Sequence, residues 1–77
     1  MRTGIIISYN HTAGVGFIKD SNKQRIRFYN EDKTVVFKQF DVVQFDISFV
    51  RNNLQAVNVI GVRDKKGNIV SMTTNIN

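Results

Sequence analysis

The sequence predicts an all-β protein that folds as one five-stranded antiparallel barrel. Short β-type segments separated by polar turns recur along the chain, and no stretch of a dozen residues keeps apolar side chains at helical spacing. The 77 residues make one small domain and predict no helix that would cover a sheet. Strands without a covering layer protect their edges by closing on themselves, so we expect a barrel.

Three strands are expected in the first part of the chain. Residues 4–10 contain three consecutive isoleucines, whose branched side chains favour an extended backbone. Residues 15–20 and 24–29 flank the turn-forming stretch Ser21–Lys23. Because so short a turn brings its flanking strands together, the second and third strands are expected to pair as an antiparallel hairpin.

The fourth expected strand has the clearest period. Its apolar side chains alternate with Gln44, Asp46 and Ser48, which predicts one dry face and one wet face. The expected dry face consists of Val43, Phe45, Ile47 and Phe49. A turn at Arg51–Asn53 then leads to the fifth strand, residues 54–62.

The barrel is expected to occupy residues 1–62. Residues 63–77 are expected to be a C-terminal extension that either adds a short edge strand or frays. Residues 30–40 should connect the third and fourth strands irregularly. There we favour Phe37 and Phe40 as residues that close one end of the barrel, and the alternative is that Phe37 projects outward as an additional ring.

Composition narrows the classes of function. Eleven Lys and Arg against six Asp and Glu give a formal net charge of +5 and a pI near 10.0. This balance favours a polyanionic partner, most often nucleic acid, and the alternative is that the charge serves only solubility. No apolar run approaches the length of a bilayer span, and the N-terminus lacks the apolar region of a signal peptide. We therefore expect a cytoplasmic protein without a membrane partner.

Catalysis and metal binding have little to build on. The absence of cysteine excludes disulfides, thiol catalysis and cysteine-ligated zinc, and a single histidine, His11, excludes a histidine-rich metal site within one chain. No Ser–His–Asp set is recognisable, and the spacing of Gly14 and Gly16 is too short for a dinucleotide fingerprint. We expect no enzyme, no cofactor and no metal site.

Strand alternation predicts where aromatic and basic side chains meet. On the third expected strand, Ile26 and Phe28 belong in the core, because burying the arginines of the other face would cost far more than a small barrel offsets. With Ile18 also inward, the outer face of the hairpin carries Val15, Phe17, Lys19, Arg25, Arg27 and Tyr29. Rings stack on bases and cations bind phosphates, so this face is typical of single-stranded nucleic-acid binding. The alternative places Phe17 in the core and leaves the cations as ordinary solvated residues.

Five stretches of the chain resemble the cold-shock domain family in order and spacing, over about residues 3–62. They are residues 4–10 (GIIISYN), 13–18 (AGVGFI), 26–29 (IRFY), 40–45 (FDVVQF) and 55–59 (QAVNV). The corresponding family motifs are Gly-x-Val-Lys-Trp-Phe-Asn, Lys-Gly-Phe-Gly-Phe-Ile, Val-Phe-Val-His, Gly-Asp/Gln-x-Val-x-Phe and Gln-Ala-x-Asn-Val. The resemblance implies an oligonucleotide-binding barrel (OB-fold) that binds single-stranded RNA or DNA on the face of its second and third strands.

The departures from the family fall on that face. They are Ser8 at the stacking tryptophan, Val15 and Arg27 at two phenylalanines, Tyr29 at the histidine, and Asn53 and Leu54 where a loop proline and glycine are missing. Each stacking ring is worth roughly 1–3 kcal/mol, so the loss of three predicts a weaker, more electrostatic and less base-selective binder.

The expected binding residues follow from the alternation and from the resemblance. We expect Phe17 and Tyr29 to stack on bases with help from Tyr9, while Val15 completes the face. Phosphates should be held by Lys19, Arg25 and Arg27, and the resemblance implies a base contact for Gln55.

The expected function is therefore binding of single-stranded RNA or DNA with little sequence preference. The resemblance implies a role as an RNA chaperone or a regulator of gene expression. The alternative is a barrel whose face has been repurposed to bind an acidic protein partner. A homo-oligomer formed through the C-terminal tail is a variant of that alternative.

Overall fold

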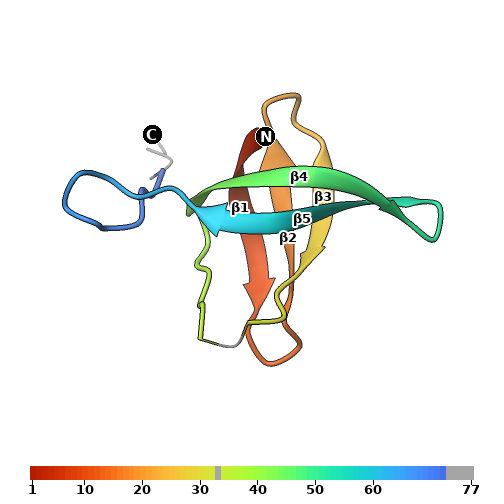
Figure 1. Cartoon of the computed structure of the whole chain (residues 1–77), viewed down its shortest axis with the longest axis horizontal. Helices are drawn as coiled ribbons and strands as arrows, with labels where there is room; N and C mark the ends of the chain where they lie inside the picture. The colour runs from red at the N-terminus through yellow and green to blue at the C-terminus, as the bar shows by residue number, and fades with distance from the viewer. Residues whose placement is uncertain (33, 73–77) are drawn as a thin grey trace, which may run out of the picture.

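Five strands close into a barrel in the computed structural model of the chain, which describes residues 1–32 and 34–72 (Figure 1). The strands are β1 (Arg2–Asn10), β2 (Val15–Asp20), β3 (Arg25–Tyr29), β4 (Val42–Val50) and β5 (Asn53–Gly61). Their order around the barrel is β1-β2-β3-β5-β4. Within the described residues there is no helix, and hence none that could span a membrane. The predicted all-β, five-stranded barrel is confirmed, and its architecture is consistent with an OB-fold-like barrel.

One contact in the barrel is parallel, so the expectation of a purely antiparallel barrel is wrong. β1 pairs antiparallel with β2 and β4, and the β2–β3 and β4–β5 pairs are also antiparallel. β3 and β5 run parallel through only two residue pairs, Arg27–Gln55 and Phe28–Ala56. The reason is the long connection over residues 30–41, which carries the chain across the barrel before β4 begins. β5, rather than β4, thereby reaches β3 and runs in the same direction.

The core is built from inward-facing residues of all five strands and from one residue of the connection. It consists of Ile6, Ile18, Ile26, Phe28, Phe37, Val43, Phe45 and Ala56. Phe37 is only 7% exposed and its ring lies edge-on to Phe28, with a centroid distance of 5.4 Å. The expectation that Phe37 closes one end of the barrel is confirmed, whereas Phe40 is half-buried and lies outside the buried cluster.

Gly16 allows Phe28 to fill the centre of the barrel. A Cβ atom at Gly16 would lie 2.6 Å from Cε1 of Phe28 and 2.7 Å from the carbonyl oxygen of Ser8. Both distances are far below van der Waals contact, and neither neighbour is the free end of a flexible side chain. Only glycine therefore lets β1, β2 and the Phe28 ring approach this closely.

A bulge in β1 decides which of its later side chains face the core. Ile6 pairs with Ile18, but the next pair is Ser8 with Phe17, so Ile7 has no partner opposite it on β2. The extra residue reverses the alternation. Ser8 consequently points outward beside Phe17, and Tyr9 packs against the core.

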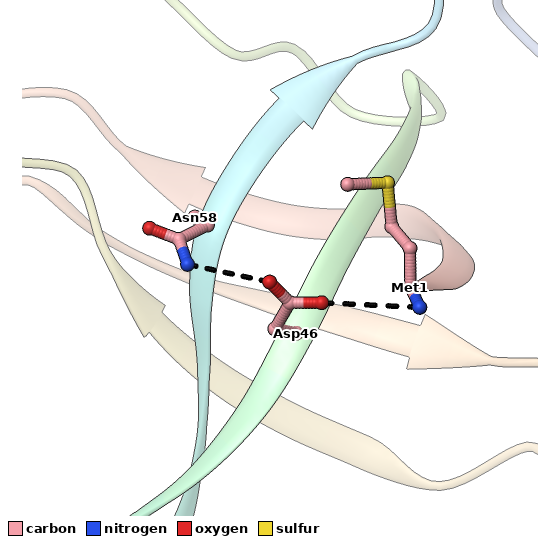
Figure 2. Close-up of polar contacts among 3 residues, drawn as sticks. All are labelled: Met1, Asp46 and Asn58. Atoms are coloured by element: carbon pink, nitrogen blue, oxygen red, sulfur yellow. Dashed lines mark hydrogen bonds and ion pairs between the residues drawn. The ribbon is translucent and has the colours of Figure 1, made fainter.

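A second bulge, in β5, is held by a carboxylate of β4. Gln44 pairs with Ile60 and Asp46 with Val57, so two residues of β5 lie opposite Phe45. One of them, Asn58, has a positive φ of 53°, a conformation that asparagine tolerates. Figure 2 shows the Asp46 carboxylate between two partners: it accepts a hydrogen bond from Nδ2 of Asn58 at 3.3 Å and lies 3.9 Å from the Met1 amino group.

The β4–β5 hairpin extends beyond the barrel, which corrects the predicted dry face of β4. β1 pairs with β4 only as far as Phe45, and β3 pairs with β5 only at Gln55 and Ala56. Within residues 1–32 and 34–72, no third strand therefore pairs with residues 49–54 at the tip of the hairpin. Phe49, which was expected on the dry face, is 74% exposed. Figure 1 shows this tip at one end of the long axis of the molecule.

The described part of the C-terminal extension, residues 63–72, lies at the opposite end of the long axis (Figure 1). The amide of Val42 donates to the carbonyl of Val70 at 2.9 Å, and the amide of Val70 donates to the carbonyl of Val62 at 2.8 Å. Two isolated bridges, Asp41–Ser71 and Arg63–Ile69, complete this pairing. Residues 73–77 of the expected extension lie outside the described residues.

Replacing Gly16 with alanine should destabilise the barrel by about 1–3 kcal/mol, because the new methyl group overpacks against Phe28 and the β1 backbone. Urea unfolding followed by circular dichroism measures the loss. Gly61→Ala is the matched control, since its Cβ would contact only the Ile69 side chain, and the one short distance, 2.6 Å, is to the terminal Cδ1. Equal losses in the two variants would contradict the assigned role of Gly16.

Candidate nucleic-acid interface

The outer face of the β2–β3 hairpin consists of three cross-strand pairs. Val15 lies opposite Tyr29, Phe17 opposite Arg27, and Lys19 opposite Arg25. The inward residues of the same strands are buried, and on β3 burial alternates strictly between exposed and buried. The predicted direction of the six outward side chains is confirmed. Tyr29 is 47% exposed, whereas Phe17 and Val15 are half-buried by their neighbours.

Two guanidinium groups lie over the Phe17 ring. The Cζ atoms of Arg25 and Arg27 are 5.6 Å and 5.5 Å from the ring centroid, within the range of a cation–π interaction. Such contacts contribute about 0.5–1 kcal/mol at exposed sites and hold the long arginine side chains near the sheet. The ring thus positions two cations side by side, and its own exposed surface is partly taken up by them.

An open hollow of about 760 Å³ adjoins these arginines. The parallel contact between β3 and β5 ends at Arg27 and Gln55, and the hollow occupies the space beyond it, toward the β4–β5 turn. We call it the basic hollow. Its lining residues are Phe17, Arg25, Arg27, Tyr29, Val50, Arg51, Asn53, Leu54 and Gln55.

All charged side chains among the described lining residues of the basic hollow are positive. Arg25 and Arg27 come from β3, and Arg51 comes from the β4–β5 turn, while no acidic residue is among the lining residues that the structure describes. Half-buried Gln55 adds an amide that can both donate and accept hydrogen bonds. Three guanidinium groups, two rings and the side-chain amides of Asn53 and Gln55 match the chemistry of phosphates and bases. The described residues hold no cluster of His, Cys, Asp and Glu suited to a metal ion.

The structure brings together five of the eight residues that the sequence singled out. Phe17, Arg25, Arg27, Tyr29 and Gln55 all line the basic hollow. Val15 and Lys19 lie on the same sheet face but do not line the hollow. Residues 62–72 leave this face open, because they pair at the far end of the long axis (Figure 1).

Tyr9 is placed differently from the expectation. Its ring stacks on Phe28 at a centroid distance of 5.8 Å and meets the Phe37 ring edge-on at 5.6 Å. Its hydroxyl oxygen accepts a hydrogen bond from Nδ2 of Asn30 at 3.0 Å. The β1 bulge at Ile7 is the cause, since it turns Tyr9 toward the core. Tyr9 therefore supports the end of the barrel and does not join the outer face of the hairpin.

Four lining residues were not among the predicted binding residues. They are Val50, Arg51, Asn53 and Leu54, all at the tip of the β4–β5 hairpin. The turn at Arg51–Asn53 is visible in the sequence, but its position beside β3 depends on the parallel contact.

Comparison with models of known protein families finds no match, and comparison with curated protein sequences finds none either.

Arg51 occupies a backbone conformation that does not suit arginine. Arg51 and Asn52 have φ angles of 52° and 68°, and two positive values at the centre of a two-residue hairpin are typical of a type I′ turn. Asparagine and glycine are preferred there, and a larger residue costs about 1–2 kcal/mol. Strained residues are concentrated at functional sites. In this conformation, Arg51 lines the basic hollow.

Replacing Arg51 with asparagine should move stability and binding in opposite directions. We expect unfolding to become about 1 kcal/mol less favourable, because asparagine tolerates positive φ. Affinity for a single-stranded oligonucleotide should fall, and the log–log salt slope should shrink by about 0.7. Asn52→Gly is the control, since it relaxes the same turn without removing a charge. A loss of stability in the Arg51 variant would contradict the strain argument.

Proposed function

We propose that this protein binds single-stranded nucleic acid, RNA or DNA, with low sequence specificity, through the outer face of β2 and β3 and the basic hollow. The observation that carries the proposal is the pair of guanidinium groups held over Phe17, in a hollow whose described lining includes a third arginine and no acidic residue. Guanidinium groups displace the counterions of a phosphate backbone, and aromatic rings accept any base.

The arginines are proposed to serve two purposes. Their charge neutralises phosphates, and the planar guanidinium group also stacks on bases. Contact with Phe17 reduces the freedom that Arg25 and Arg27 would lose on binding, which lowers the entropic cost of forming the complex. Tyr29, exposed at the edge of the hollow, is the proposed ring for base stacking, and Gln55 is proposed to hydrogen-bond a base edge.

The resemblance to the cold-shock domain family supports the same class of ligand. The barrel, its strand order and the outward face of β2 and β3 are compatible with a divergent member of that family. We propose such membership, together with a role in RNA folding or in gene expression. We also propose a cytoplasmic binding protein without catalytic activity, whose arginine, phenylalanine and glutamine side chains only bind phosphates and bases.

An exposed apolar tip favours a second candidate function, the binding of a protein partner. Phe49 is 74% exposed, and Leu54, directly opposite it on β5, is 45% exposed. A protein partner with an acidic surface would contact the arginines, and its apolar side chains would contact this tip. Binding of an acidic peptide together with no binding of oligonucleotides at low salt would favour this second candidate.

Binding to a mixed-sequence single strand should weaken steeply with salt. If three arginines each neutralise one phosphate, the log–log slope of affinity against salt is about −2. Fluorescence anisotropy of a labelled oligonucleotide at several salt concentrations measures it. An affinity that does not change between low and moderate salt would contradict an electrostatic interface.

Phe17→Leu should weaken binding about fivefold, because leucine keeps the apolar contact with the sheet but holds neither guanidinium group. Arg27→Lys keeps the charge and loses the planar group, so it should bind more weakly than the parent and more tightly than Arg27→Ala. Lys66→Ala, in the turn at the far end of the molecule, is the control. Equal affinities for Arg27→Lys and the parent would show that only charge matters.

A further inference from the structure

A second hollow continues the basic hollow and carries the opposite charge. The two hollows share Tyr29 and Gln55 as lining residues, so they adjoin each other, and we call the two together the groove. Glu31 and Asp32, both exposed, line the second hollow, and no cation is among its described lining residues. We call these two residues the acidic turn. Among the described lining residues of the groove, the charge therefore changes sign at Tyr29 and Gln55.

The acidic turn is fastened to the barrel. The amide of Asp32 donates to Oδ1 of Asn30 at 3.2 Å, and Nδ2 of Asn30 donates to the hydroxyl of Tyr9 and to the carbonyl of Val35. Tyr9 in turn stacks on the core ring of Phe28. The backbone of Asp32 is thus hydrogen-bonded to a residue that is itself bonded to a core-packed ring.

Asp32 is held as a carboxylate. Its Oδ1 accepts a hydrogen bond of 2.6 Å from the Thr34 hydroxyl and one of 2.9 Å from the Thr34 amide. These bonds favour the charged form and lower the pKa of Asp32 below its usual value. The charge is present at any pH at which nucleic-acid binding would be measured.

We infer that the acidic turn limits the strand path, so that the site takes a short segment of single-stranded nucleic acid and excludes further phosphates beyond Tyr29. This inference rests on the proposed function and adds the length of its ligand. From Arg25 to Tyr29, β3 covers roughly 13 Å at about 3.3 Å per residue. At about 3.4 Å per stacked nucleotide, this length holds about four nucleotides, the low end of the range for OB-folds.

Oligothymidylates of two to twelve nucleotides, titrated by anisotropy, test the limit. The affinity, divided by the number of positions at which the site can bind the oligonucleotide, should rise up to a length of about four nucleotides and then stay level. Glu31→Gln should raise the affinity for eight nucleotides two- to threefold and leave that for four nearly unchanged, which is the size of one charge–charge contact at about 8 Å in water. Glu31→Lys should enlarge the same ratio further.

Gln39→Lys is the matched control, because it adds the same unit of charge at an exposed position that lines neither part of the groove. It should change the two affinities by the same factor. The limit is overturned if the affinity of the parent protein, divided by the number of possible binding positions on the oligonucleotide, keeps rising to eight nucleotides. It is also overturned if Glu31→Gln and Gln39→Lys change the ratio of the affinities for eight and four nucleotides equally. In both cases the proposed function stands. If no oligonucleotide binds, or if Phe17→Leu and Arg27→Ala bind as the parent does, the proposed function fails and the inference fails with it.

Discussion

Two residue pairs between β3 and β5 close the barrel and assemble the candidate interface at the same time. Phe28 and Ala56 meet on the inner side and complete the core, whereas Arg27 and Gln55 meet on the outer side. Because successive residues of a strand point to opposite faces, the inner contact cannot form without the outer one. The pairing goes no further, so the strands separate toward the β4–β5 turn, and the basic hollow lies in that space.

The interface combines an apolar anchor with charge, which suits a barrel too small to bury many groups. The half-buried Phe17 ring contacts Arg25 and Arg27, so the guanidinium groups lie against the sheet while keeping access to solvent. Arg51 joins them from a turn with an unfavourable backbone conformation. The acidic turn lies at the other end of the groove. Positive and negative side chains are therefore separated along the surface, which the net charge alone does not describe.

Much of this arrangement follows from alternation, and the exceptions have identifiable causes. The outward direction of Arg25, Arg27 and Tyr29 was predictable because their neighbours in the strand are strongly apolar. The position of Tyr9 was not, because a bulge within three consecutive isoleucines leaves no local signal: an isoleucine suits either face of a strand. Phe49 continues a perfect alternation, but it is exposed because no third strand of the described chain pairs with the hairpin tip.

The sequence by itself determined which segments form strands and which side chains of the β2–β3 hairpin oppose its apolar face. Both depend on the period of the backbone, which is a local property. Only the tertiary structure decided that Arg51 and Leu54 lie beside those side chains and that the acidic turn follows them in one groove. These neighbours come from parts of the chain far apart in sequence, and their approach depends on the direction and the short extent of the parallel contact that closes the barrel.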